Sequence, residues 1–254
     1  ITADVTDING ETRSATTIVK VGYHALQASI EVDERINKIK KPQTITIDTK
    51  NLNGEFVPAQ GRIKIYKLEA PNRVLRSRVW SAPDYQDLSE EEFESKFPHQ
   101  AYKNEADSKN WEKGELVFES DFDTEKVDSI KLGNLKQWKS GKYLIVLQSE
   151  DKFGQSVKDE ARFNLFSPND KTLADNQLFS IDTDKDSYSS GQNVELTLGT
   201  SAENLLVTVQ VEKNEQIVKT FMVPLSNSKQ TLAIPVTKED RGGFAIHYST
   251  SAFN

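Results

Sequence analysis

The chain has 254 residues, a length that suits two ordinary domains. Its formal net charge is −7, and this acidic excess argues against a nucleic-acid groove or adhesion to an anionic membrane, since both need a basic surface. The lack of cysteine excludes disulfides, thiolate metal sites, cysteine nucleophiles and a thioester within the chain. No apolar run approaches the roughly 20 residues of a membrane-spanning helix. No signal peptide is visible and Ile1 is not a natural start, so we expect the chain to be a piece of a longer protein.

Residues 1–22 are expected to form a β-hairpin. Asn9-Gly10 lies between two strand-like runs and is a strong signal for a two-residue turn, since both residues tolerate positive φ. Two strands cannot bury a core by themselves. A similar strand, Asp-x-x-Gly turn and strand recurs from Asp151 to Gly154, where it closes a unit. Residues 1–22 are therefore either the closing hairpin of a preceding β-domain, which we favour, or a strand pair that the following domain borrows.

Residues 23–168 are expected to form a first β-sandwich, because several segments alternate apolar and polar side chains. The segment around Tyr143, Ile145 and Leu147 is apolar on nearly both sides, which predicts a central strand. We expect strands at 26–32, 43–49, 61–68, 115–120, 129–132, 141–149 and 160–166.

Residues 71–114 break this pattern and are expected to be an insertion with a short helix. Ser89 and Glu92 have the spacing of a capping box, in which each side chain bonds the other residue's backbone amide. Phe93 and Phe97 would share one helix face, and Pro98 would end the helix.

The insertion is rich in aromatic residues, and this gives it two interpretations. Trp80, Tyr85, Tyr102 and Trp111 would suit a platform for sugar or peptide, because aromatic rings give contact area at low entropic cost. The same residues, with Phe93 and Phe97, would also suit a small satellite core that ties the insertion to the sandwich, and we favour this second interpretation.

Residues 169–254 are expected to form a second antiparallel sandwich, since short strands recur regularly with turns between them. Asn214-Glu215 predicts a tight hairpin turn. No second Asp-x-x-Gly hairpin closes this unit, so we expect it to lack its last strand. The expected strands are 178–183, 193–200, 205–213, 216–225, 229–235 and 243–249.

No residue cluster identifies an enzyme, a metal or a cofactor. Asp182, Asp184 and Asp186 are spaced like the start of an EF-hand loop, but Ser187 and Asn193 stand where such a loop needs glycine and glutamate. The histidines are scattered, and no Gly-x-Ser-x-Gly nucleophile motif occurs. We therefore expect an all-β, tandem antiparallel sandwich protein without catalytic residues, cofactor or metal.

Short motifs resemble those of the α2-macroglobulin family. The Tyr-x-x-Gly-x-x-Val block from Tyr188 to Val194 and the segment from Val5 to Thr12 resemble parts of its macroglobulin domains. A further set of positions looks like the large bacterial members: Glu92-Phe93, Phe97-Pro98, Tyr102, Glu105 and Trp111.

The resemblance implies a structural role. Macroglobulin domains frame a bait segment, and protease trapping would be located elsewhere in the protein. It implies other domains of the same chain as partners, proteases only through the full-length protein, no nucleic acid, and no membrane contact by this segment. It also implies a periplasmic or cell-envelope location, with a lipid-anchored parent protein. Two alternatives remain: a cell-surface adhesin or carbohydrate-binding β-sandwich using the aromatic insertion, and an accessory β-region of a polysaccharide-degrading enzyme.

Overall fold

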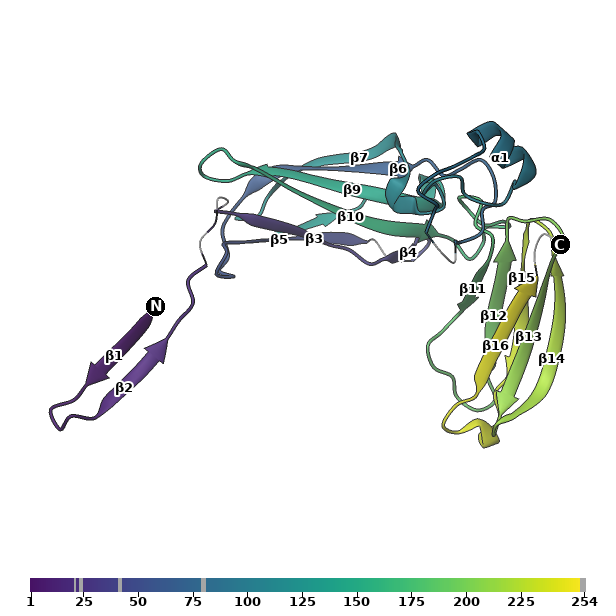
Figure 1. The fold of residues 1–254 in the computed structure, drawn as a ribbon. Helices are drawn as coiled ribbons and strands as arrows, with labels where there is room; N and C mark the ends of the chain where they lie inside the picture. The colour runs from purple at the N-terminus through teal and green to yellow at the C-terminus, as the bar shows by residue number, and fades with distance from the viewer. Residues whose placement is uncertain (21, 23–24, 41–42, 79–80, 252–254) are drawn as a thin grey trace. The chain divides into compact units, whose positions relative to one another are not determined.

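The computed structural model describes residues 1–20, 22, 25–40, 43–78 and 81–251, and their fold is all-β (Figure 1). The chain divides into two compact units. The first contains Ile1–Lys67, Glu115–Lys139 and Tyr143–Asn164, and the second contains Leu68–Gly114, Ser140–Lys142 and the chain from Leu165 onward. The structure thus groups the insertion with the second sandwich, whereas the domain boundaries expected at residues 22 and 168 stay predictions.

The N-terminal hairpin pairs β1 (Thr2–Thr6) with β2 (Thr12–Thr16), and the residues of both strands are exposed. The expected two-residue turn is wrong, because Gly10 has a φ of +85° while Asn9 keeps negative φ. The loop is instead closed by Asp7, whose Oδ1 accepts hydrogen bonds from the amides of Asn9 and Glu11, both at 2.9 Å. This carboxylate supplies the acceptor that fixes the turn, so a second positive φ is not needed.

The same turn recurs twice in the first unit. Asn51 Oδ1 accepts from the amides two and four residues further on, at 2.9 and 3.0 Å, and Asp151 Oδ1 does the same at 2.9 Å for both. Gly54 and Gly154 hold φ of +88° and +77°. The sequence repeat at Asp7 and Asp151 therefore corresponds to one recurring local structure.

The first unit is a sandwich of two antiparallel sheets with the strand orders β3-β5-β8 and β4-β10-β9-β6-β7. The predicted central position of the strand around Tyr143 is confirmed, since β9 is third of five. The core side chains include Ile45, Ile47, Ile63 and Ile145, all of them buried. The strands are β3 (Gln27–Glu31), β4 (Arg35–Asn37), β5 (Thr44–Lys50), β6 (Gln60–Leu68), β7 (Lys113–Asp123), β8 (Ser129–Lys131), β9 (Gly141–Glu150) and β10 (Ser156–Phe166).

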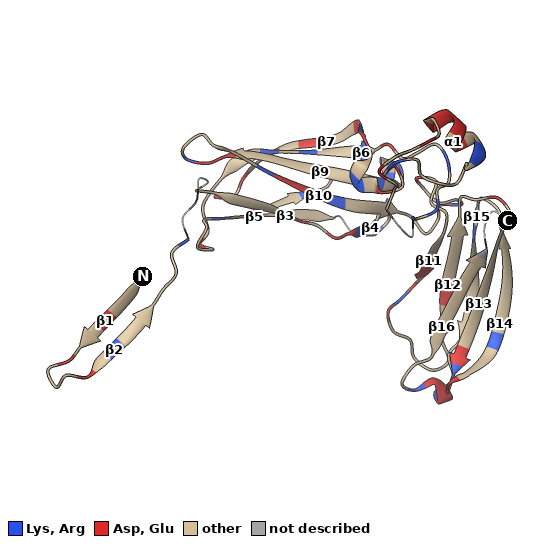
Figure 2. Cartoon of the chain, viewed as in Figure 1, with Lys and Arg blue, Asp and Glu red and all other residues tan. Residues whose placement is uncertain are grey.

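The insertion contains the predicted helix, α1 (Glu90–Lys96). The capping box is confirmed: Glu92 N donates to Ser89 Oγ at 3.3 Å, and Ser89 N donates to Glu92 Oε2 at 3.1 Å. The hydrogen bonds that Glu92 accepts from the Ser89 backbone amide and, to a smaller extent, from the Ser89 side chain lower the pKa of Glu92. Figure 2 shows the acidic beginning and basic end of α1, a charge order that suits the helix dipole. The described residues also contain three short 3₁₀ turns, one in the insertion at Ser108–Asn110 and two outside it at Leu135–Gln137 and Lys238–Asp240.

The second unit contains another sandwich of two three-stranded antiparallel sheets, ordered β11-β12-β15 and β14-β13-β16. The expected turn between β13 and β14 is confirmed, since Asn214 and Glu215 have φ of +50° and +62°. The core consists of alternate side chains of facing strands, such as Leu196, Leu198, Val207 and Val209. The strands are β11 (Ser180–Thr183), β12 (Asn193–Thr200), β13 (Leu205–Lys213), β14 (Gln216–Leu225), β15 (Ser228–Pro235) and β16 (Ala245–Ser251).

Within the part of the chain that the structure describes, no helix has the length and apolar character needed to cross a membrane.

Candidate functional site

Three of the four aromatic residues proposed as a binding surface lie among the described residues, and Trp80 lies outside them. Tyr102 places its ring edge against Phe93, with the ring centroids 5.4 Å apart, and its hydroxyl donates to the Leu88 carbonyl at 2.9 Å. Trp111 Nε1 donates to the Glu105 carbonyl at 2.7 Å. Tyr85 differs, because 78% of its surface is exposed. Two of these three residues therefore direct their polar atoms to the backbone of the insertion itself.

A carboxylate and a guanidinium organise the insertion around these rings. Arg73 Nη2 donates to Glu94 Oε1 at 2.6 Å and to Glu105 Oε1 at 3.2 Å. Glu105 Oε2 also accepts from the Lys103 amide at 2.8 Å. Burial opposes ionisation of Glu105, but backbone amides and Arg73 outweigh it and lower its pKa. Glu105 was recognised from the sequence only through the family resemblance, and Arg73 was not singled out because its partners lie 21 and 32 residues away.

An open cleft of about 470 Å³ lies beside α1. Phe93 and Phe97, with ring centroids 5.0 Å apart, supply apolar lining together with Pro83. Arg76, Arg78 and two glutamines contribute polar lining. With both apolar and polar lining, this cleft is the part of the described insertion best suited to bind a ligand.

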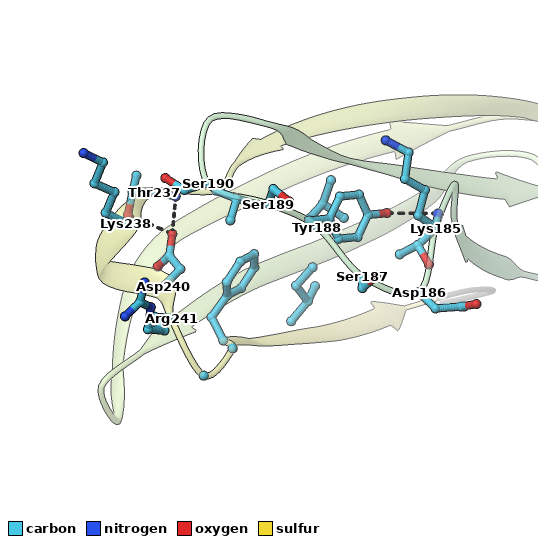
Figure 3. A pocket seen from close by; sticks show the side chains of 17 residues that line it. Lys185, Asp186, Ser187, Tyr188, Ser189, Ser190, Thr237, Lys238, Asp240 and Arg241 are labelled. Carbon is cyan, nitrogen blue, oxygen red and sulfur yellow. Dashed lines mark hydrogen bonds between the residues drawn. The ribbon is translucent and has the colours of Figure 1, made fainter.

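A larger groove of about 1190 Å³ belongs to the second sandwich (Figure 3). The loop that follows β11 forms one wall, and the segment between β15 and β16 forms another. Its apolar lining consists of Tyr188, Val194, Val236, Phe244 and Ile246. No pattern in the sequence predicted this groove, since its lining comes from segments about 50 residues apart.

Two carboxylates near this groove, Asp184 and Asp240, are bonded within the sandwich. Asp240 accepts from Lys213 Nζ, which lies 2.7 Å from its Oδ1, and from the Thr237 amide at 2.7 Å. Tyr188 donates its hydroxyl proton to Asp184 Oδ1 at 2.6 Å. The pKa of Tyr188 is raised mainly by burial and further by the hydrogen bond to Asp184. These bonds hold the two walls in place. Across the described ranges no group of three His, Cys, Asp or Glu side chains is arranged to hold a metal ion.

The pairing with Lys213, followed by the Thr237 amide, lowers the pKa of Asp240. A carboxylate with a lowered folded-state pKa stabilises the fold above its unfolded pKa of about 3.9 and loses that contribution as the pH falls through the folded value. We expect Asp240→Asn to lower the melting temperature at neutral pH and to weaken its dependence on pH between about 5 and 2. Thermal unfolding followed by circular dichroism tests this. Asp186→Asn, at an exposed carboxylate of the same groove, is the control and should leave the melting temperature at neutral pH unchanged.

Comparison with known proteins gives distant structural likenesses. No protein-family model matches the chain, and no curated protein matches it. The tetra-tandem repeat in the extending region of a large adhesion protein has 13% identity and a TM-score of 0.32, with 98% of this chain and 54% of that one covered. E. coli α2-macroglobulin in its native conformation has 10% identity and a TM-score of 0.32, with 98% and 18% covered. A Salmonella α2-macroglobulin mutant has 11% identity and a TM-score of 0.33, with 98% and 16% covered.

The chain thus spans about half of the adhesin structure and under a fifth of each α2-macroglobulin. Likenesses at this level assign neither a family nor a function to the chain.

Proposed function

We propose that this chain is a structural segment of a bacterial α2-macroglobulin-like protease inhibitor and has no enzymatic activity of its own. Its sandwiches would frame bait cleavage and protease trapping that occur elsewhere in the protein. The observation that carries this proposal is the internal bonding of the insertion: Tyr102 and Trp111 donate to the carbonyls of Leu88 and Glu105. Polar atoms that donate hydrogen bonds to the local backbone stabilise the fold and are not available to a ligand.

The Tyr-x-x-Gly-x-x-Val block supports the same role, because each of its three motif residues serves the sandwich. Tyr188 bonds Asp184 at 2.6 Å. Gly191 has a φ of +90°, and its amide donates to the Val236 carbonyl at 2.8 Å. Val194 is buried in the core. The block therefore joins a turn to a strand, as expected for a framework element.

In this proposal the partners are other domains of the same protein, and proteases engage the whole protein in the periplasm or cell envelope. The intact protein is treated with a panel of proteases while its mass and hydrodynamic radius are followed. Cleavage at one stretch, with compaction and retained protease, supports the framework role. Diffuse cleavage without trapping or compaction counts against it.

A variant pair tests the framework role within this chain. Trp111→Phe removes the indole N–H and leaves the Glu105 carbonyl without that donor, so we expect it to cost about 1 kcal/mol of unfolding free energy. Tyr85→Ala removes an exposed ring and should leave stability within about 0.5 kcal/mol of wild type. Urea unfolding gives both values. Wild-type stability of Trp111→Phe would contradict the structural role of this ring.

The second candidate is a cell-surface adhesin or carbohydrate-binding module. Tyr85 is exposed, and the cleft lined by Phe93, Phe97 and Pro83 offers apolar surface in the same insertion. Binding of the chain to a glycan array separates the candidates. Glycan binding that Tyr85→Ala abolishes without loss of stability would replace the framework role by recognition, whereas the framework role predicts no specific glycan binding.

A further inference from the structure

The cleft beside α1 has a local charge opposite to that of the chain. The sequence carries a formal net charge of −7. The described residues that line the cleft nevertheless include Arg76 and Arg78 and no aspartate or glutamate. Cations that line a hollow without carboxylates among them raise the local concentration of anions there. The lining therefore favours an anionic ligand, in contrast to the chain as a whole.

Arg78 brings to this cleft a donor that no described residue satisfies. Its Nη2 donates to the carbonyl of the fully buried Ala101 at 2.5 Å. Its Nε is buried as well and has no hydrogen-bond partner among the described residues. A buried donor without an acceptor destabilises a fold, and a guanidinium presents its donors as a planar fork that matches a carboxylate. A carboxylate is thus the anion that Arg78 is best shaped to bind.

Arg162 on β10 provides a comparison for Arg78. Its Nε is likewise buried without a hydrogen-bond partner among the described residues. Its Nη2, however, lies 3.4 Å from Glu160 Oε2, so its charge already faces a carboxylate of its own strand. The cleft at Arg78 has no carboxylate in its described lining. The unsatisfied Nε is therefore common to both arginines, whereas the lack of a carboxylate in the surrounding lining distinguishes Arg78.

Phe93 and Phe97 form the apolar part of the cleft, together with Pro83. The centroids of the two rings are 5.0 Å apart and their planes are inclined at 48°. The Tyr102 ring contacts Phe93 edge-on, with centroids 5.4 Å apart, so Phe93 is held in place before a ligand binds. Inclined rings enclose an apolar side chain better than they support the flat face of a sugar, and 45% of Phe97 is exposed for such contact.

We propose that this cleft binds the C-terminal end of a peptide whose last residue is apolar. The peptide carboxylate pairs with Arg78, and the apolar side chain packs on Phe93 and Phe97. A C-terminal residue carries both groups on one Cα, so both fit within a single small cleft. The volume of about 470 Å³ lies in the lower half of the range for ligand sites, about 300–1,000 Å³, and suits such a short segment. This inference goes beyond the proposed function, since a framework role requires no ligand at this cleft.

Fluorescence polarisation of a labelled peptide tests the proposal on the full chain. The probe is Gly-Gly-Gly-Ser-Phe with fluorescein at its N-terminus and a free C-terminal carboxylate. We expect saturable binding, and binding at least about tenfold weaker for the same peptide ending in a carboxamide, because the amide carries no charge for Arg78. A peptide ending in alanine should also bind more weakly, since it buries less apolar surface. These comparisons change the ligand and leave the protein unaltered.

Matched variants locate the site in the chain. Arg78→Gln should weaken binding of the free acid at least about tenfold and leave the weak binding of the carboxamide unchanged. Phe97→Ala should weaken binding of both peptides, because it removes apolar contact. Arg162→Gln, at the other arginine with an unsatisfied Nε, is the control and should bind like the wild type. Melting temperatures followed by circular dichroism verify that the variants are folded. Arg78→Lys keeps the charge but loses the planar fork, so it should also weaken binding of the free acid, and it replaces Arg78→Gln if that variant is unfolded.

Several results would overturn the proposal. They are equal affinities for the free acid and the carboxamide, wild-type affinity in a folded Arg78→Gln chain, and no binding of the free acid up to about 1 mM. Binding of trigalacturonate, an acidic oligosaccharide, without binding of the peptide would also overturn it and would assign the cleft to the second candidate function. Binding that depends on the free carboxylate, on Arg78 and on Phe97 supports the proposal.

Discussion

Replacing Tyr143 by alanine should lower the unfolding free energy of the first unit by about 4 kcal/mol, the largest stability loss that we expect from a single substitution in this chain. The ring is fully buried between two aromatic neighbours, with centroid distances of 5.4 Å to Trp138 and 5.2 Å to Phe163. Its removal leaves a cavity in the central strand β9, where neighbours on both sides limit relaxation.

The conservative variant separates the ring from its hydroxyl. Tyr143 Oη donates to the Lys139 carbonyl at 2.6 Å, and Tyr143→Phe removes this bond while keeping the packing. We expect it to cost about 1 kcal/mol. Urea unfolding followed by Trp138 fluorescence measures both variants, because this indole lies against the tyrosine. A loss below about 2 kcal/mol for the alanine variant would mean that β9 is not the centre of a cooperative core.

Local patterns predicted the strands well where alternation was strong. The ranges of β12, β13 and β14 match the expected ones residue for residue. In β13 the reason is clear, because its side chains alternate between a buried and a wetter face. β4 was not expected: it has three residues and one buried side chain, Ile36, which is too short for a periodic signal. Helix α1 was predicted from its capping residues, whose interactions are local.

The candidate sites were harder to predict because they depend on distant pairings. Trp111 and Tyr102 were recognised as aromatic, but the choice between a platform and a satellite core depends on which carbonyls their polar atoms reach. The groove beside β16 is present because, among the described strands, β16 pairs only with β13. No pattern within β16 reports this, since its sequence reads like that of any half-buried strand.

Asp151 and Asp7 make the same turn in different surroundings, and this pair allows a second large effect to be predicted with its own control. Asp151 is 7% exposed, and its Oδ2 accepts from the Ala25 amide at 3.1 Å in addition to the two bonds that its Oδ1 makes within the turn. Asp7 makes the two turn bonds in an exposed hairpin. Asp151 therefore joins the closing turn of the sandwich to the start of its first strand, whereas Asp7 orders only its own loop.

We expect Asp151→Ala to lower the unfolding free energy of the first unit by about 3 kcal/mol, since it removes the acceptor of three amides, one of them 126 residues away. Asp7→Ala should change it by less than about 0.5 kcal/mol, because the hairpin residues are exposed. Asp151→Asn keeps an Oδ1 acceptor but turns an N–H towards the Ala25 amide, so its loss should lie between these two. Urea unfolding of the three variants provides the test. Equal losses at Asp7 and Asp151 would show that turn formation alone, and not the tie to Ala25, determines the stability of the unit.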